Sequence, residues 1–136
     1  MAEYAKPVPV PTSDSKPYWE AAKRHELMMQ RCKDCGQVYF PPAVCCSRCA
    51  SLKVEWVKLS GKGKVYSWNL FHQVFHPGFA ADIPYACVVV ELDEGPRMVS
   101  SLVDCQPEEI QIDMTVEVVF EDITEQIALP KFKRAS

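Results

Sequence analysis

The sequence predicts a mainly β protein, in which an N-terminal helix and a metal-binding ribbon precede a small closed barrel. Three observations carry this prediction: two C-x-x-C pairs, an amphipathic segment before them, and a series of short strand patterns after them. With 136 residues the chain forms one or two small domains with a modest core. We predict an arm and helix over 1–28, a zinc ribbon over 29–52 and an OB-fold barrel over 53–136.

Composition and charge narrow the class of protein. The chain is 48% hydrophobic and 24% charged, which is globular composition rather than disorder. It has no apolar run of membrane-spanning length and no hydrophobic signal core at its start, so we expect a cytoplasmic protein without a membrane partner. Residues 1–64 carry a net charge of +5, and residues 65–136 carry −8. The basic half would attract phosphates or an acidic protein surface, whereas the acidic half would repel a nucleic-acid backbone.

The two C-x-x-C pairs are the most specific chemical signal in the chain. Ten residues separate them, so a short loop can bring four thiolates to one tetrahedral metal. Gly36 can supply the positive φ that follows such a turn. Four protein ligands leave no open position, so the metal is structural; zinc is expected, and iron in a rubredoxin-type site is the chemical alternative. Cys45 is set aside because only Cys46 keeps the two-residue gap, and the predicted ligands are Cys32, Cys35, Cys46 and Cys49.

The segment before the ribbon combines a proline-rich arm with a helix. Pro7, Pro9 and Pro11 favour an extended arm. Ser13 or Asp14 can then cap a helix that we place over 14–26. We expect the helix to pack on its own chain, with a clasp for a partner as the alternative. The predicted apolar face consists of Trp19, Ala22, Leu27 and Met28, and His25 is expected to lie exposed on the helix.

Strand patterns fill the second half of the chain. Gly61 and Gly63 interrupt the first two strands, and a glycine kink would let one long strand serve both sides of a closed barrel. A turn-rich loop over 76–84 follows the long strand. The five predicted barrel strands are 54–59, 64–75, 85–93, 97–105 and 115–122, which suits an OB-like barrel.

These pieces together resemble a known family. The matching stretches are PYWEAAKRHELMMQRCKDCG, the FPP before the second cysteine pair, WVKLSGKGKVYSWNLFH, PYACVVVELDEGPRM and the closing LPKF. They resemble the acyl-CoA-associated proteins that consist of an N-terminal helix, a rubredoxin-like zinc ribbon and a C-terminal OB fold, formerly a domain of unknown function. The resemblance covers almost the whole chain. Ala50 and Asp113 stand where the family often has glycine, so the turn at Ala50 is expected to be less regular.

The resemblance implies an accessory subunit. Members accompany thiolase-like partners as hetero-oligomers that act on CoA thioesters, and they include the small zinc-finger subunit of benzoylsuccinyl-CoA thiolase. Basic side chains could meet CoA phosphates, and loop 76–83 could be a flap toward a partner or thioester; a solvated turn and a packed barrel loop are the alternatives. The candidate contact residues are Arg31, Lys33, Arg48, Lys62, Lys64, His76 and Phe79.

No catalytic residue is predicted. Cys87 lies in an apolar strand and is expected to be a buried small hydrophobe, and Cys105 lies beside an acidic residue that would raise its pKa. A single-stranded nucleic-acid binder is the alternative function, with stacking aromatic residues, although Tyr66 and Trp68 should share a strand face that Phe71 does not. An independent carrier of CoA esters is a third possibility.

Overall fold

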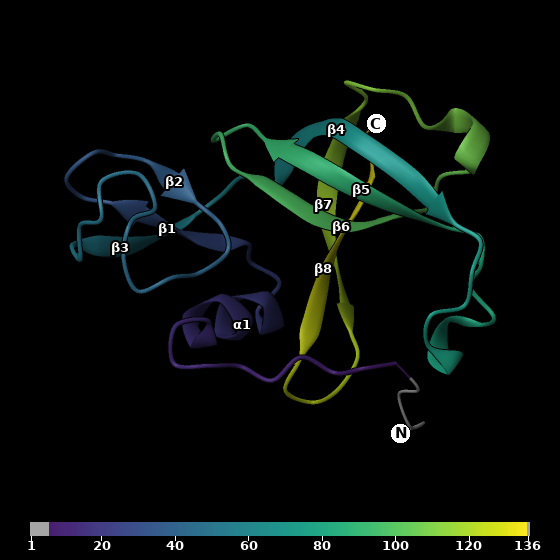
Figure 1. Cartoon of the computed structure of the whole chain (residues 1–136), viewed down its shortest axis with the longest axis horizontal. Coiled ribbons are helices and arrows are strands. Elements are labelled where there is room, and N and C mark those ends of the chain that lie inside the picture. The colour runs from purple at the N-terminus through teal and green to yellow at the C-terminus, as the bar shows by residue number, and fades with distance from the viewer. Residues whose placement is uncertain (1–5, 136) are drawn as a thin grey trace.

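The computed structural model describes residues 6–135 and confirms the predicted fold class. The ribbon is a three-stranded sheet of order β2-β1-β3, and the barrel is closed in the order β4-β5-β6-β8-β7. Figure 1 shows the ribbon beside the barrel, with the helix below them. The elements are α1 (Lys16–Lys23), β1 (Met28–Cys32), β2 (Val38–Tyr39), β3 (Val54–Lys58), β4 (Lys62–Phe71), η1 (Pro77–Phe79), β5 (Tyr85–Leu92), β6 (Arg97–Val103), η2 (Pro107–Glu109), β7 (Thr115–Asp122) and β8 (Ala128–Arg134).

The helix α1 is shorter at both ends than predicted. Ser15 is its N-cap, and His25 leaves the helical conformation with a φ of 63°. His25 is therefore exposed but lies outside the helix, where Nε2 contacts Asp122 Oδ1 at 3.0 Å and the ring stacks on Phe120. Leu27 enters the core from the chain that follows the helix rather than from the helix itself. The buried face of α1 consists of Tyr18, Ala21 and Ala22.

The structure corrects the predicted assignment of strands to the barrel. The strand β3 pairs with β1 in the ribbon sheet instead of opening the barrel. The fifth barrel strand is β8, which runs parallel to β6 and antiparallel to β7. The sequence pattern missed β8 because Pro130 and three basic residues weaken its strand signal. Alternation alone could not show which sheet β3 joins, since it predicts a strand and not its neighbour.

The long strand β4 closes the barrel at a glycine, as the sequence predicted. Gly63 pairs with Leu92 on β5 and with Val116 on β7, so this strand serves both sides. A Cβ atom at Gly63 would lie 2.5 Å from the carbonyl oxygen of Glu91. Only glycine therefore fits between the two neighbouring strands.

A bulge in β4 reverses the expected placement of its aromatic residues. The register with β5 shifts between Val65 and Ser67. Tyr66 consequently stays exposed while Trp68 packs against the core, so the two residues do not share a face.

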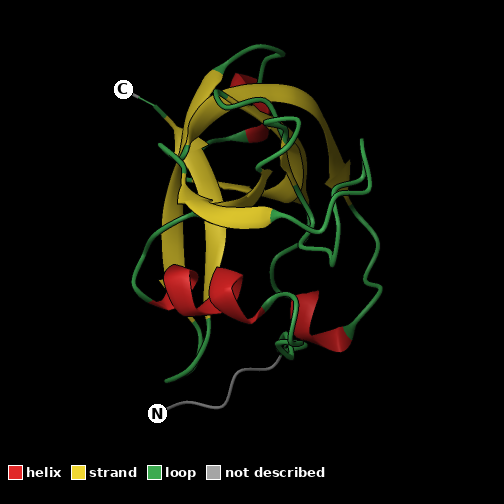
Figure 2. Cartoon of the chain, turned by 90° about the vertical axis from the view of Figure 1, so that its left-hand side faces the viewer, coloured by secondary structure: helices red, strands yellow, loops and turns green. Residues whose placement is uncertain are grey.

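One hydrophobic core joins the helix, the ribbon and the barrel. Figure 2 shows α1 across one end of the barrel strands, and α1 contacts both β1 and β8. Tyr18 of α1 and Met29 of β1 belong to the same buried cluster as the barrel residues Val88, Val90 and Phe132. A smaller cluster lies in the ribbon and consists of Cys32, Tyr39 and Cys46. None of the helices in residues 6–135 is long and apolar enough to cross a membrane.

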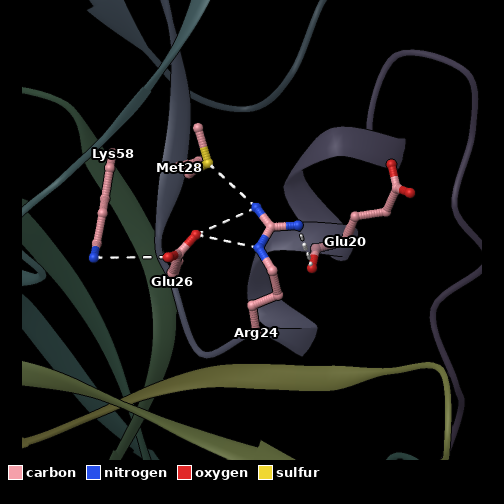
Figure 3. A network of polar contacts seen from close by, with 5 residues as sticks. All are labelled: Glu20, Arg24, Glu26, Met28 and Lys58. Carbon is pink, nitrogen blue, oxygen red and sulfur yellow. Dashed lines mark hydrogen bonds and ion pairs between the residues drawn. The ribbon is translucent and has the colours of Figure 1, made fainter.

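An exposed polar network follows α1 and connects it to the ribbon (Figure 3). Arg24 donates to Glu26 Oε1 at 3.2 Å and to the carbonyl oxygen of Glu20 at 3.3 Å. The other carboxylate oxygen of Glu26 lies 3.7 Å from Nζ of Lys58 on β3. Exposed ion pairs contribute under about 1 kcal/mol each, so this network adds little to the stability of the fold.

We predict that Gly63→Ala lowers the free energy of unfolding by about 2 kcal/mol, because overpacking a close strand contact forces the backbone apart. Urea unfolding followed by far-UV circular dichroism measures the change. Ser67→Ala, at an exposed position of the same strand, is the matched control and should be close to neutral. Equal stability of both variants would contradict the close packing at Gly63.

Candidate metal centre

The first cysteine pair forms a compact knuckle at the end of β1. The amide N–H of Cys35 donates to Cys32 Sγ at 3.4 Å, and that of Gly36 donates to the Cys32 carbonyl oxygen at 2.9 Å. Gly36 has a φ of 79°, as the sequence predicted. The turn thus points both thiols of this pair to one side of the chain.

The second pair forms a knuckle of the same kind. The amide N–H of Arg48 donates to Cys46 Sγ at 3.3 Å, and that of Ala50 donates to the Cys46 carbonyl oxygen at 2.9 Å. Ala50 adopts a φ of 61° despite its side chain. The expectation of a less regular turn is therefore wrong: alanine takes the left-handed conformation, which costs about 1–2 kcal/mol for such a residue.

The two knuckles bring four sulfur atoms into one group. The Sγ atoms of Cys32, Cys35, Cys46 and Cys49 all lie within 4.8 Å of one another. The closest approaches are 3.5 Å between Cys32 and Cys49 and 3.6 Å between Cys35 and Cys46. Cys45 is not a member of this group. Cys32 and Cys46 are buried and their partners are exposed, so the metal-binding group lies at the surface with one side in the ribbon.

The close thiols shift one another's pKa values in opposite directions. The amide of Cys35 lowers the pKa of the Cys32 thiol to about 6. The amide of Ser51 lowers the pKa of Cys49, but the neighbouring thiol of Cys32, burial and the other thiols outweigh it and raise that pKa to about 12. Four thiolates at this separation repel one another, and a divalent metal removes the repulsion. An all-sulfur tetrahedral set suits zinc or iron.

Gln30 holds the loop between the two pairs, and sequence analysis missed it. Its side chain donates to the carbonyl oxygen of Ala43 at 2.9 Å and accepts from the Ala43 amide at 2.7 Å. Gln30 is only 5% exposed and is the buried polar residue among those that the structure describes. A glutamine at alternate positions from Met28 and Cys32 in the strand was the available signal, since a buried amide needs partners.

Tyr39 lies against the metal-binding group. Its side chain is 5% exposed and packs with Cys32 and Cys46. Among residues 6–135 its hydroxyl is the buried side-chain polar atom without a hydrogen-bond partner. Burial raises the pKa of Tyr39, and the next largest influences are the thiols of Cys46 and Cys32. The hydroxyl therefore stays protonated at neutral pH.

The predicted basic contact residues lie in different settings. Arg31 on β1 binds Glu55 of β3, with Nη2 2.7 Å from Oε2. The side chains of the other four are exposed and make no ion pair with any residue in the described part of the chain; they are Lys33, Arg48, Lys62 and Lys64. Their role in contact with a partner or CoA stays a prediction.

The predicted flap lies far from the ribbon. The loop around η1 is at the opposite end of the molecule from β2 in Figure 1. His76 Nδ1 accepts from the amide of Gly78 at 3.0 Å, which orders the loop. Phe79 is half-buried, stacks on Tyr85 and lies 5.0 Å below the ammonium of Lys6. The predicted contact residues thus form at least two separate groups rather than one site.

The remaining cysteines lack the features of a nucleophile. Cys87 is half-buried on β5 rather than fully buried as expected, and burial raises its pKa. The pKa of Cys105 is raised, as predicted, first by burial and then by Glu109 rather than by the adjacent Asp104. A catalytic cysteine needs a lowered pKa, so neither residue is suited to that role.

The family models agree with this architecture. Residues 19–55 match the model of the ChsH2 rubredoxin-like zinc ribbon domain, and residues 56–121 match that of the ChsH2 C-terminal OB-fold domain. A solved chain described as "Ltp2-ChsH2(DUF35) aldolase" superposes with a TM-score of 0.84 at 36% identity, over 95% of this chain and 100% of that chain. The chain therefore belongs to the ChsH2 (DUF35) family of zinc-ribbon and OB-fold proteins.

The relatives of this chain include subunits of different enzymes and scaffold proteins. A DUF35 domain-containing scaffold protein of Methanocaldococcus jannaschii is 44% identical, over 79% of this chain and 77% of its own length. A probable enoyl-CoA hydratase alpha subunit of Thermomonospora curvata is 37% identical over 96% of this chain, which spans only 40% of that relative. A benzoylsuccinyl-CoA thiolase subunit BbsA of Geobacter metallireducens is 39% identical over 53% of this chain and 47% of its own length. The family is thus associated with acyl-CoA hydratase and thiolase complexes.

We predict that Cys46→Ser abolishes stoichiometric binding of one metal ion, whereas the adjacent Cys45→Ser leaves it intact. Only the first substitution removes a member of the four-sulfur group. Because metal binding and folding are coupled in small metal modules, loss of a ligand also destabilises the ribbon. Elemental analysis of the purified chain and titration with Co²⁺, followed by its thiolate absorption, measure both variants. Equal metal content in the two variants would contradict the assignment.

We predict that Gln30→Leu lowers the free energy of unfolding by about 2 kcal/mol and weakens metal binding. The substitution leaves the partly buried N–H and carbonyl of Ala43 without their partner, and an unpaired group that stays buried costs about 1–3 kcal/mol. Denaturant unfolding of the metal-loaded chain gives the value. Gln126→Leu, on the exposed turn before β8, is the control, and a loss no larger than in this control would refute the role of Gln30.

Proposed function

We propose that this chain is a non-catalytic accessory subunit of a complex that acts on CoA thioesters, with a thiolase-family enzyme as its partner. The observation that carries the proposal is the metal-binding group itself. Its four protein thiols fill a tetrahedral shell and leave no position for a water molecule or a substrate. We further propose that the metal is zinc with a structural role, held by Cys32, Cys35, Cys46 and Cys49, with iron as the chemical alternative.

The absence of a catalytic constellation within residues 6–135 supports this role. The two cysteines at β5 and after β6 have raised pKa values, and the His76 ring accepts a backbone hydrogen bond within its own loop. In the proposed complex the partner supplies the nucleophile and the acid–base groups. The names of relatives support the chemistry, since they include a thiolase subunit, a hydratase subunit and scaffold proteins.

The exposed aromatic surface supports a protein partner. Phe75 is 70% exposed and its ring rests edge-on against Phe71, with 6.0 Å between ring centroids. Phe71 in turn packs on Tyr85, so the exposed ring stands on an ordered base. Exposed, preorganised aromatic side chains are typical anchors of protein interfaces. Phe75 is thus a stronger candidate for the anchor of this loop than the half-buried Phe79.

The arrangement of aromatic residues weakens the nucleic-acid alternative. The guanidinium of Arg97 covers the ring of Tyr66 at 3.8 Å, and Trp68 packs against the core. The three aromatic residues named for base stacking therefore do not form one exposed platform. The third possibility, an independent carrier of CoA esters, is tested by calorimetry with acyl-CoA on the isolated chain. The subunit model expects weak binding or none in this experiment.

We predict that affinity purification of the tagged chain from its native source recovers a CoA-thioester enzyme, identified by mass spectrometry. Thiolase activity should reside in the complex and be absent from the isolated chain. Recovery of the chain as a monomer without an enzyme would contradict the proposal.

We predict that Phe75→Ser weakens the complex about tenfold or more, because loss of a central aromatic anchor costs about 2 kcal/mol or more. Titration of the purified partner into each variant measures the dissociation constant. Ile112→Ser is the matched control, since Ile112 is 57% exposed and follows η2, well separated from η1 in Figure 1. Equal losses in both variants would argue against an anchor at Phe75.

A further inference from the structure

The short strand β2 places two polar side chains beside the second cysteine pair. Gln37 immediately precedes β2 and Tyr39 ends it, and side chains two residues apart in extended backbone lie on the same side. The Gln37 oxygen Oε1 accepts from Cys46 Sγ at 3.7 Å. Tyr39 packs against Cys46 and Cys32 from the same strand. The Gln37 oxygen therefore faces a sulfur atom of the metal-binding group, and the Tyr39 side chain packs beside the same group.

The hydroxyl of Tyr39 has an unmet requirement for a hydrogen bond. It is buried, and within the described residues it has no hydrogen-bond partner. A buried hydroxyl without a partner costs about 1–3 kcal/mol, so an ordinary core would place phenylalanine at this position. The other tyrosine that is 5% exposed, Tyr18 of α1, is not left in this state. The requirement is specific to the tyrosine beside the cysteines.

Metal binding would make Cys46 a stronger acceptor. A cysteine must lose its proton to bind a metal, so its sulfur changes from a weak donor and weak acceptor into a negatively charged acceptor. The same change removes the proton that Cys46 shares with Gln37, and the Gln37 amide can then turn its NH₂ group toward the sulfur. Donors to metal-bound ligands tune the strength of the site and the electronic properties of the metal.

We propose that Tyr39 is a positioning residue of the metal centre, whose hydroxyl donates a hydrogen bond to the thiolate of Cys46 once the metal is bound. Gln37 is its neighbour in this role. The proposal rests on metal binding by the four cysteines and does not depend on the identity of the partner enzyme. It explains why a buried, unpaired hydroxyl is retained in the smaller core cluster of the ribbon.

The test compares Tyr39→Phe with Tyr18→Phe in the full-length chain. Both variants remove one hydroxyl from a tyrosine that is 5% exposed, but only the first lies beside the cysteines. Affinity for Zn²⁺ is measured by competition with a chelator, and thiolate-to-metal absorption is recorded with Co²⁺. We expect Tyr39→Phe to lower the zinc affinity about tenfold or more and to shift the Co²⁺ bands, while Tyr18→Phe changes neither.

A second readout separates the proposed role from a merely structural one. In the metal-free chain, where the ribbon lacks the order that the metal supplies, Tyr39→Phe should leave stability in urea unchanged, in contrast to its effect on metal affinity. In the iron-loaded chain, loss of a donor to sulfur should lower the reduction potential, because such hydrogen bonds stabilise the reduced, more negative centre.

Three results would overturn the proposal. Zinc affinity and Co²⁺ spectra of Tyr39→Phe that match those of the unchanged chain would exclude the hydrogen bond. An equal loss of stability with and without metal would assign Tyr39 a packing role. Failure of the unchanged chain to bind Zn²⁺ or Co²⁺ would reject the metal centre itself, which is distinguishable from a failure specific to Tyr39.

Discussion

The four sulfur atoms of the ribbon define the constraint on which this part of the molecule depends. The ribbon has only a small buried cluster of its own, which consists of Cys32, Tyr39 and Cys46. So small a cluster cannot offset the conformational entropy of an ordered loop, and small metal modules resolve this by coupling folding to metal binding. The two knuckles supply the geometry, since each directs its amide groups at a cysteine sulfur or carbonyl oxygen. The metal then supplies the attraction that the thiols alone lack.

The strand β1 transmits this order to the rest of the protein. Met29 enters the core that it shares with α1 and the barrel, Gln30 holds the loop between the cysteine pairs, and Cys32 begins the first knuckle. A single five-residue strand therefore joins the barrel core to the metal-binding group. The helix, the ribbon and the barrel thus share one major core. This arrangement suits a subunit that must hold exposed surfaces in fixed relative positions, as the proposed accessory function requires.

The sequence was sufficient to predict the cysteine knuckles and the closed barrel, but not the placement of every strand. Cysteine spacing and Gly36 indicated the knuckles because metal geometry acts over a few residues. Gly63 indicated the closure of the barrel because a shared strand leaves no room for a side chain. Placement of β3 in the ribbon could not be inferred, since strand alternation does not identify a pairing partner. Pro130 hid β8 for a similar reason, because local propensity opposed a strand that tertiary pairing with β6 and β7 imposes.

The candidate metal centre was also predicted only in part. The four predicted ligands come together, but the supporting residues Gln30 and Tyr39 were not foreseen, because their importance depends on contacts across the ribbon. The contact residues predicted at loop 76–83 also changed in rank, since the structure exposes Phe75 and half-buries Phe79. The bulge after Val65 had no sequence signal strong enough to reveal it, and it decided which aromatic side chains face outward.

Amide hydrogen exchange of the metal-loaded chain and of the chain after removal of the metal tests the central claim most directly. If the metal orders the ribbon, amides within residues 32–54 should lose their protection when the metal is removed. Amides of β4 to β8 should keep most of theirs. Uniform loss of protection over the whole chain, or no change in the ribbon, would contradict the account.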